Sequence, residues 1–136
     1  MDIYHLDKDI QVFCKAATSF PDGVLEAHQS LHRLVSFSPQ RQYYGISWMD
    51  KNGDIIYKAA AAELTPGELS KHNLESFTIR NGDYIYIDIK NFMENVPAIG
   101  QAFTQLKSDE RIDPQGAAVE WYINETDVRC MIRIIN

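Results

Sequence analysis

The chain has 136 residues, of which 45% are hydrophobic and 11% aromatic, enough for one domain with its own apolar core. Its formal net charge is −6 and it has no cluster of Lys or Arg to neutralise phosphates, so we expect no direct binding to nucleic acid. No apolar run approaches the roughly 18 residues of a membrane-spanning helix, so we expect no membrane insertion either.

The N-terminus and the cysteines indicate the compartment. Residues 1–5 show no basic region followed by a long apolar stretch, so no signal peptide is predicted. Cys14 and Cys130 are too few and too far apart to indicate a disulfide framework, and their apolar neighbours favour buried, unreactive thiols. We therefore expect a cytoplasmic protein.

The predicted elements begin with a strand, a helix and a β-hairpin. Residues 10–19 are strand-like, and apolar side chains recur at helical spacing over residues 24–34. Strands over residues 43–49 and 54–61 flank a turn at residues 50–53, whose Asn-Gly pair is a strong signal for a hairpin.

The same order of elements is predicted to follow in the second part of the chain. Asn95 is the expected cap of its helix, and Pro97 fits the first helical turn. The elements are, in order, a short helix after the capping-box spacing of residues 65–68, an extra strand over 77–79, an alternating strand over 83–89, a helix over 96–106, and a hairpin after the turn at 113–116.

These two parts of the chain also match in sequence. The segments ISWMDKNGDIIYKAA (46–60) and VEWYINETDVRCMIR (119–133) align Trp48 with Trp121 and Asp54 with Asp127 at an offset of 73. The helical segments AHQSLHRL (27–34) and IGQAFTQL (99–106) match at an offset of 72. The shared spacing favours an internal duplication over a chance resemblance.

The duplication predicts the fold class. We expect an α+β domain in which two pseudo-symmetric β-α-β-β repeats form one antiparallel sheet with two main helices on one face. The first repeat spans about residues 8–62 and the second about 74–136, joined by a connector over 63–73. A central ligand cleft is expected between the two halves.

Glu120 is unusual, because a carboxylate interrupts the apolar strand AAVEWYI. Its equivalent in the first repeat is Ser47, so the fold itself requires no acid there. Alternation places Glu120 on one strand face with Tyr122, and Trp121 on the other. Burial of an unpaired carboxylate costs several kcal/mol or raises its pKa, so it is either paired internally or used for binding.

The partner of Glu120 depends on the register of the second hairpin. A tight turn over residues 124–127 would place Trp121 opposite Cys130 and Glu120 opposite Met131, with Arg129 beside the glutamate's face and Arg133 near it. An ion pair with either arginine, or simple exposure of Glu120 on an open sheet face, is then the structural alternative to a ligand anchor.

Four segments together resemble the GyrI-like effector-binding family: RQYYGISW, IRNGDYIYIDI, DPQGAAVEWYI and VRCMIRI. The resemblance covers residues 12–134. The family consists of small-molecule-binding domains attached to DNA-binding modules in multidrug-responsive transcription regulators, and of free-standing proteins. It implies the duplicated fold and a glutamate in the penultimate strand, at the bottom of an aromatic pocket that takes lipophilic cations. Glu120 falls on that position.

One departure from the regulators of this family concerns the DNA-binding domain. Residues 1–9 are too short to form one, and the duplicated fold accounts for the remainder, so we expect a single effector-binding domain over residues 1–136.

The predicted ligand-binding residues combine the carboxylate with aromatic side chains. For Trp48 and Trp121, core packing under the helices is the alternative to ligand contact. For Tyr84 and Tyr86, the alternative to lining the face of Glu120 is an exposed strand face. The full set is Glu120, Tyr122, Trp121, Trp48, Tyr44, Tyr84 and Tyr86.

No cofactor or metal site is predicted. No glycine-rich phosphate loop occurs. His28 and His32 stand four apart on one helix, a spacing that suits a shared metal, but no third ligand accompanies them. Two exposed polar helix residues are therefore the preferred interpretation.

Three functions are carried forward. The favoured one is a binding or sensing domain for amphipathic or cationic small molecules. The second, implied by hydrolase relatives in the resembled family, is hydrolysis of reactive small-ring compounds by Glu120 with a nearby tyrosine; the sequence shows no complete catalytic set, so binding is preferred over catalysis. The third is a protein-interaction module similar to the gyrase inhibitor of that family. A protein partner or a homodimer is compatible with all three.

Overall fold

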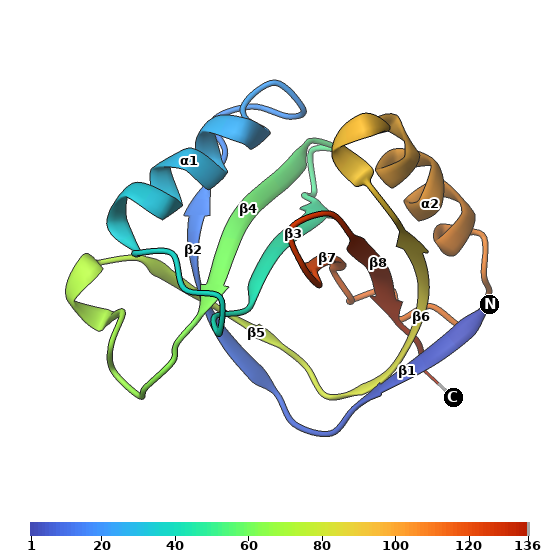
Figure 1. Cartoon of the computed structure of the whole chain (residues 1–136). Helices are drawn as coiled ribbons and strands as arrows, with labels where there is room; N and C mark the ends of the chain where they lie inside the picture. Colours follow the sequence, from blue (N-terminus) through green and yellow to red (C-terminus); the bar gives the residue numbers. More distant parts are fainter. Residues whose placement is uncertain (136) are drawn as a thin grey trace.

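A computed structural model describes residues 1–135 and confirms the α+β class. Eight strands form one antiparallel sheet in the order β1-β6-β8-β7-β3-β4-β2-β5, and two main helices lie on the same face of it (Figure 1). No helix among these residues is both long and apolar enough to cross a membrane.

The elements follow the predicted order. The strands are β1 (Asp2–Leu6), β2 (Ile10–Ala16), β3 (Tyr43–Met49), β4 (Ile55–Ala62), β5 (Glu75–Ile79), β6 (Gly82–Ile89), β7 (Ala118–Tyr122) and β8 (Val128–Arg133). The helices are α1 (Val24–Leu34) and α2 (Pro97–Lys107), with short 3-10 turns η1 (Ser70–His72) and η2 (Phe92–Glu94).

Two local predictions need correction. Strand β1 was not predicted, because its five residues carry no turn signal and become a strand only by pairing with β6. Asn95 does not cap α2: the cap position is Val96 and no side chain bonds to the helix N-terminus there. Pro97 does occupy the first turn.

The duplication is visible in the strand register. Ser47 pairs with Tyr57 in the first hairpin, and Glu120 pairs with Cys130 in the second, so both partners keep the offset of 73. Between the repeats, β3 pairs with β7 so that Ile46 lies opposite Val119, its own repeat equivalent. The pseudo-twofold axis therefore passes between the two central strands.

The sheet is strongly curled. Strand β1 pairs with β6 and β2 pairs with β5, both antiparallel. The chain bends between β1 and β2 and again between β5 and β6 (Figure 1). The concave face encloses one apolar core, which includes Tyr44, Ile46 and Val119. On the opposite face, α1 and α2 each cover a separate core.

Each helix packs on the sheet through buried apolar side chains. Leu31 of α1 is fully buried against Ala59 and Ala61 of β4. In α2, Leu106 is fully buried and packs with Phe103 against β6 and β8. The two helices are thus anchored to different halves of the sheet, and the space between them is left open.

Equivalent leucines in the two helices provide a test of this packing. Leu106 is 0% exposed, whereas Leu34, its repeat equivalent, is 39% exposed. We expect Leu106→Ala to lower the free energy of unfolding by about 2–5 kcal/mol, because it leaves a cavity. Leu34→Ala should cost less than about 1 kcal/mol. Urea denaturation measures both; equal losses would contradict the packing described.

Candidate functional site

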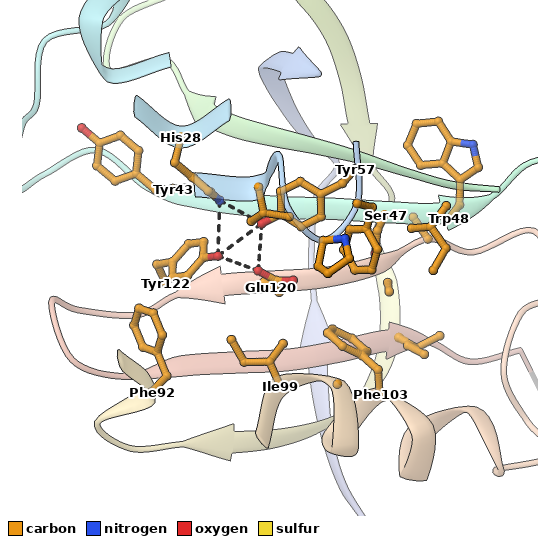
Figure 2. A pocket seen from close by; sticks show the side chains of 18 of the residues that line it. His28, Tyr43, Ser47, Trp48, Tyr57, Phe92, Ile99, Phe103, Glu120 and Tyr122 are labelled. Atoms are coloured by element: carbon orange, nitrogen blue, oxygen red, sulfur yellow. Dashed lines mark hydrogen bonds between the residues drawn. The ribbon is translucent and has the colours of Figure 1, made fainter. Parts of the chain in front are cut away.

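A pocket of about 1710 Å³ lies between α1 and α2, over the central strands. Small-molecule sites commonly have about 300–1,000 Å³, so this one has room for a large ligand. Its walls are mainly apolar and aromatic side chains from both repeats, and Glu120 lies at its base (Figure 2). That this pocket is a ligand cleft stays a prediction.

The base of the pocket is a hydrogen-bonded cluster of four side chains. The Tyr57 hydroxyl donates to Oε1 of Glu120 at 2.9 Å, and the Tyr122 hydroxyl donates to the same oxygen at 2.5 Å. Nε2 of His28 lies 2.8 Å from the Tyr57 oxygen and 3.4 Å from the Tyr122 oxygen. His28 and Tyr57 come from the first repeat, and Glu120 and Tyr122 from the second (Figure 2).

When Glu120 is ionised, the hydrogen bonds of this cluster fit one arrangement of protons. Each tyrosine hydroxyl has a single hydrogen, and both are directed to Oε1 of Glu120. The short contact between His28 and Tyr57 then requires Nε2–H of His28 to donate. Burial lowers the pKa of His28 to about 4, so the ring is neutral near pH 7 and carries this single proton on Nε2.

Oε2 of Glu120 is left available. Both hydrogen bonds to the carboxyl group reach Oε1. Among the described side chains, the only fully buried nitrogen or oxygen without a partner is Nε of Arg41. Oε2 is therefore not sealed inside the protein: it opens to the pocket as an acceptor, although the residue as a whole is only 8% exposed.

Burial controls the ionisation of the cluster. It raises the pKa of Glu120, while the hydrogen bonds from Tyr122 and Tyr57 act in the opposite direction. Burial and the nearby carboxylate raise the pKa of both tyrosines well above the usual value, so they remain donors. The same two causes raise the pKa of the neighbouring Cys130 thiol to about 12.

A glycine makes this approach of side chains possible. Gly45 of β3 pairs with Glu120 of β7. A Cβ at position 45 would lie 2.1 Å from the Tyr57 hydroxyl oxygen and 2.7 Å from Oε1 of Glu120. The glycine of the Tyr44-Gly45-Ile46 motif therefore provides the space in which the two repeats share one hydrogen-bonded cluster.

The structure divides the predicted site residues between the two faces of the sheet. Glu120 and Tyr122 lie together in the pocket, and Trp48 lies at its edge, stacked on Phe77 at 5.7 Å between ring centroids. The remaining four pack in or against the concave core and do not line this pocket: Tyr44, Tyr84, Tyr86 and Trp121.

The predicted position of Tyr84 and Tyr86 on the face of Glu120 is therefore wrong. Alternation within β6 was recognised, but the sequence does not tell which face of the strand meets the concave core. The Tyr84 hydroxyl donates to the backbone oxygen of Arg80 at 2.5 Å, and Tyr86 lies under the guanidinium of Arg129.

The register predicted for the second hairpin is also wrong. Glu120 pairs with Cys130 and Trp121 with Arg129, because the loop is one residue longer than assumed. Oδ1 of Asn124 accepts hydrogen bonds from the backbone of Thr126 and Asp127 and holds this longer loop.

The corrected register removes the ion-pair alternative for Glu120. Arg129 lies on the concave face, 3.9 Å from the centroid of Tyr86, and pairs with Asp88 at 2.7 Å. Arg133 pairs with Asp113 at 3.0 Å. Both arginines have carboxylate partners elsewhere, so neither neutralises Glu120.

Tyr57 and His28 were missed as site residues. Tyr57 is the repeat equivalent of Cys130, an ordinary core residue, so alternation in β4 was its only signal. His28 was predicted to be an exposed polar residue, with a shared metal as the alternative; this is wrong, because His28 is half-buried in the pocket against Tyr57. His32 instead packs on Tyr43 at 4.9 Å, and no group of three His, Cys, Asp or Glu side chains in residues 1–135 is placed to hold a metal.

The comparisons with known proteins define the fold. No family model matches the chain, and no curated protein matches it in sequence. An integron cassette protein from the mobile metagenome of Vibrio cholerae, VCH_CASS2, superimposes with a TM-score of 0.73 at 13% identity, covering 98% of this chain and 95% of that one. A hydrolase from Listeria innocua gives 0.53 at 10% identity, over 98% and 91%.

These likenesses span almost the whole length of each chain, so this α+β half-barrel is an established protein fold. At 10–13% identity they show the architecture alone. Membership of the GyrI-like family is supported neither by a family model nor by a sequence match.

The raised pKa of Glu120 predicts a pH-dependent stability. Below the ordinary pKa of 4.5, the carboxyl group is protonated in both the folded and the unfolded chain. Above it, only the folded protein retains the proton. The free energy of unfolding therefore falls by about 1.4 kcal/mol for each pH unit between the ordinary pKa and the pKa in the folded protein.

Glu120→Gln should abolish this loss, because its amide oxygen still accepts both tyrosine hydrogens. We expect the variant to be more stable than the wild type at about pH 8, with a difference that shrinks toward pH 4.5. Urea denaturation across this range measures it. His28, whose depressed pKa gives the opposite slope, is common to both proteins. A difference independent of pH would contradict the assignment.

Proposed function

We propose that this chain is a binding domain for amphipathic small molecules that carry a positive charge, similar in role to the GyrI-like effector-binding domains. One observation carries the proposal: a buried carboxylate lies at the base of an apolar pocket, and its Oε2 faces that pocket without a cationic partner among the described residues.

The site suits a cation better than a neutral ligand. Taking a carboxylate out of water is costly, and the two tyrosine hydroxyls offset only part of that cost, because the pKa remains raised. A cationic N–H donor at Oε2 would supply both the missing charge and a strong hydrogen bond. The nearest rings of the cluster, Tyr57 and Tyr122, would add cation–π attraction of about 0.5–2 kcal/mol.

The rim of the pocket favours an apolar ligand body. Several large apolar side chains that line the pocket are solvent-exposed in the isolated chain, on the α1 side, the α2 side and the first hairpin. They are Phe20, Leu25, Phe37, Met49, Met93 and Val96. Covering such side chains contributes about 25 cal/mol per Å² of apolar surface, so a ligand with a large apolar part would gain most.

A sensing role in transcription follows only from the family resemblance. Such a role requires a DNA-binding module, in the same protein or in a partner, that responds to the bound ligand. The cytoplasmic location, the protein partner and the homodimer are likewise predictions.

The charge of Glu120 is tested with a flat cationic dye and its neutral analogue. 9-Aminoacridine is a cation near pH 7, whereas acridone has a similar ring system and is uncharged. We expect Glu120→Gln to weaken 9-aminoacridine at least about tenfold, or 1.4 kcal/mol, and to leave acridone nearly unchanged. Fluorescence titration measures both.

Glu125→Gln is the matched control, because Glu125 is an exposed acid at the rim of the same pocket. It should change the affinity for 9-aminoacridine by less than about twofold. Equal losses in the two variants would assign the effect to overall charge. Wild-type affinity in Glu120→Gln would remove the carboxylate from the binding role.

Hydrolysis is the second candidate, because one structural neighbour is described as a hydrolase and the pocket contains acid–base groups. A carboxylate with a raised pKa and an open Oε2 is suited to accept a proton from an attacking water molecule. The Tyr122 hydroxyl, which donates to Oε1 in this structure, would have to turn its hydrogen to the substrate oxygen to act as the acid. A reactive small-ring compound such as an epoxide or a strained lactone would be the substrate class.

Assaying the purified protein for turnover of these compounds distinguishes hydrolysis from binding alone. If it occurs, we expect at least a hundredfold loss of kcat in Glu120→Gln, roughly the lower bound for removing a general base. Mass spectrometry of the products with oxygen-18 water shows whether water is the nucleophile. A panel of epoxides and lactones without turnover, in a protein that binds 9-aminoacridine, would leave binding as the function.

A further inference from the structure

The internal repeat allows the two walls of the pocket to be compared position by position. His28 of α1 and Gly100 of α2 are equivalent at the helical offset of 72, and both line the pocket. One wall therefore presents an imidazole where the other presents no side chain. The pocket is built from duplicated halves but is not symmetric.

On the α1 side of the pocket, aromatic rings of the protein pack against one another next to Glu120. His28 makes edge contacts with Tyr57 at 5.8 Å and with Tyr122 at 5.4 Å between centroids. Phe20 stacks on Tyr57 at 5.9 Å. Farther along the same wall, Phe37 stacks on Tyr43 at 5.7 Å. These ring pairs occupy part of the α1 side, and Phe20 and Phe37 keep exposed apolar surface at its rim.

The α2 side is open in comparison. A Cβ placed at Gly100 would meet no atom within 4 Å outside its own helix. Ile99 and Phe103 flank this position on the wall, and Phe92 continues the wall toward Tyr122, at 5.5 Å between the two ring centroids (Figure 2). A mainly apolar wall, with Lys107 at the far end of the helix, thus borders a position that has no side chain.

We propose that the apolar body of the ligand lies on the α2 side of the pocket, across Gly100, and that this glycine sets the size of the ligand that is accepted. The inference rests on the proposed binding function and specifies how the ligand lies. Its cationic donor is at Oε2 of Glu120, and its rings pass over helix α2 between Phe92 and Phe103.

The geometry also restricts the ligand class. A bare backbone at Gly100 between two larger side chains forms a shallow slot, which suits a flat multi-ring body better than a branched one. The adjacent Phe92 ring offers a face for stacking. We therefore infer that flat, fused-ring cations bind more tightly than compact cations with the same donor group.

The proposal is tested by filling the slot without disturbing the fold. Gly100→Leu places a side chain in the space assigned to the ligand. Gln101→Leu adds the same side chain one position along α2, at an exposed residue that does not line the pocket. Gly100→Ala makes the smallest addition. Both changes at position 100 replace a glycine within a helix, so they should raise the urea concentration of half-unfolding.

The two probes are 9-aminoacridine, with three fused rings, and benzylammonium, a compact cation; binding is followed by fluorescence and by calorimetry. We expect Gly100→Leu to weaken 9-aminoacridine at least about tenfold and benzylammonium by less than about threefold. Gln101→Leu should leave both within about twofold. In Gly100→Leu, the stability of the protein would then rise while its affinity for 9-aminoacridine falls.

The outcomes separate this inference from the function on which it rests. Undiminished binding of 9-aminoacridine to Gly100→Leu, with Glu120 still required, would overturn the placement and leave the function standing. Equal losses for both probes would also overturn it, because the leucine would then act on the shared anchor. A wild-type protein that binds neither probe would overturn both.

Discussion

The candidate site is organised around one buried carboxylate that is held by two tyrosine hydroxyls. Glu120 has no counter-ion among the described residues, so its charge is stabilised only by the donors from Tyr57 and Tyr122 that reach Oε1. His28 fixes the direction of the Tyr57 hydroxyl. Because one oxygen takes both donors, the other is left as the only strong acceptor of the cluster, in an apolar setting where an unmet charge is expensive. This oxygen without a donor is the feature on which the proposed cation binding rests.

Three features of the fold place this cluster: the curl of the sheet, the separation of the two helices, and the glycine at position 45. Curling of the sheet gathers most of the aromatic side chains of the central strands on the concave face, where they form a core. The two helices are anchored to different halves of the opposite face and stand apart over the central strands. Gly45 then lets a side chain from each repeat reach the same point. Packing, spacing and backbone clearance together place a polar cluster at the bottom of an apolar pocket.

Much of the fold and part of the candidate site could be predicted from the sequence. The predictions that failed did so for physical reasons. Periodicity and turn residues were sufficient for the two β-α-β-β repeats, and alternation placed Glu120 and Tyr122 on one face. Alternation does not tell which face of β6 turns toward the helices, so Tyr84 and Tyr86 were put on the wrong side. A single extra loop residue before Asp127 changed the partner of Glu120 from Met131 to Cys130. Tyr57 entered the site through a contact between repeats, which no local pattern encodes.

The duplication within one chain has a consequence for how such a pocket arises. In a homodimer of single repeats, symmetry would force the same residue onto both copies of each position. The site would then contain either two acids, one on each side of the axis, or no acid. Likewise, either both helices or neither would carry a histidine. Covalent fusion removes that restriction, so one copy holds Ser47, Tyr57 and His28 where the other holds Glu120, Cys130 and Gly100. Divergence of the two copies therefore gives the pocket one asymmetric set of side chains, whereas a symmetric assembly would present two identical half-sites.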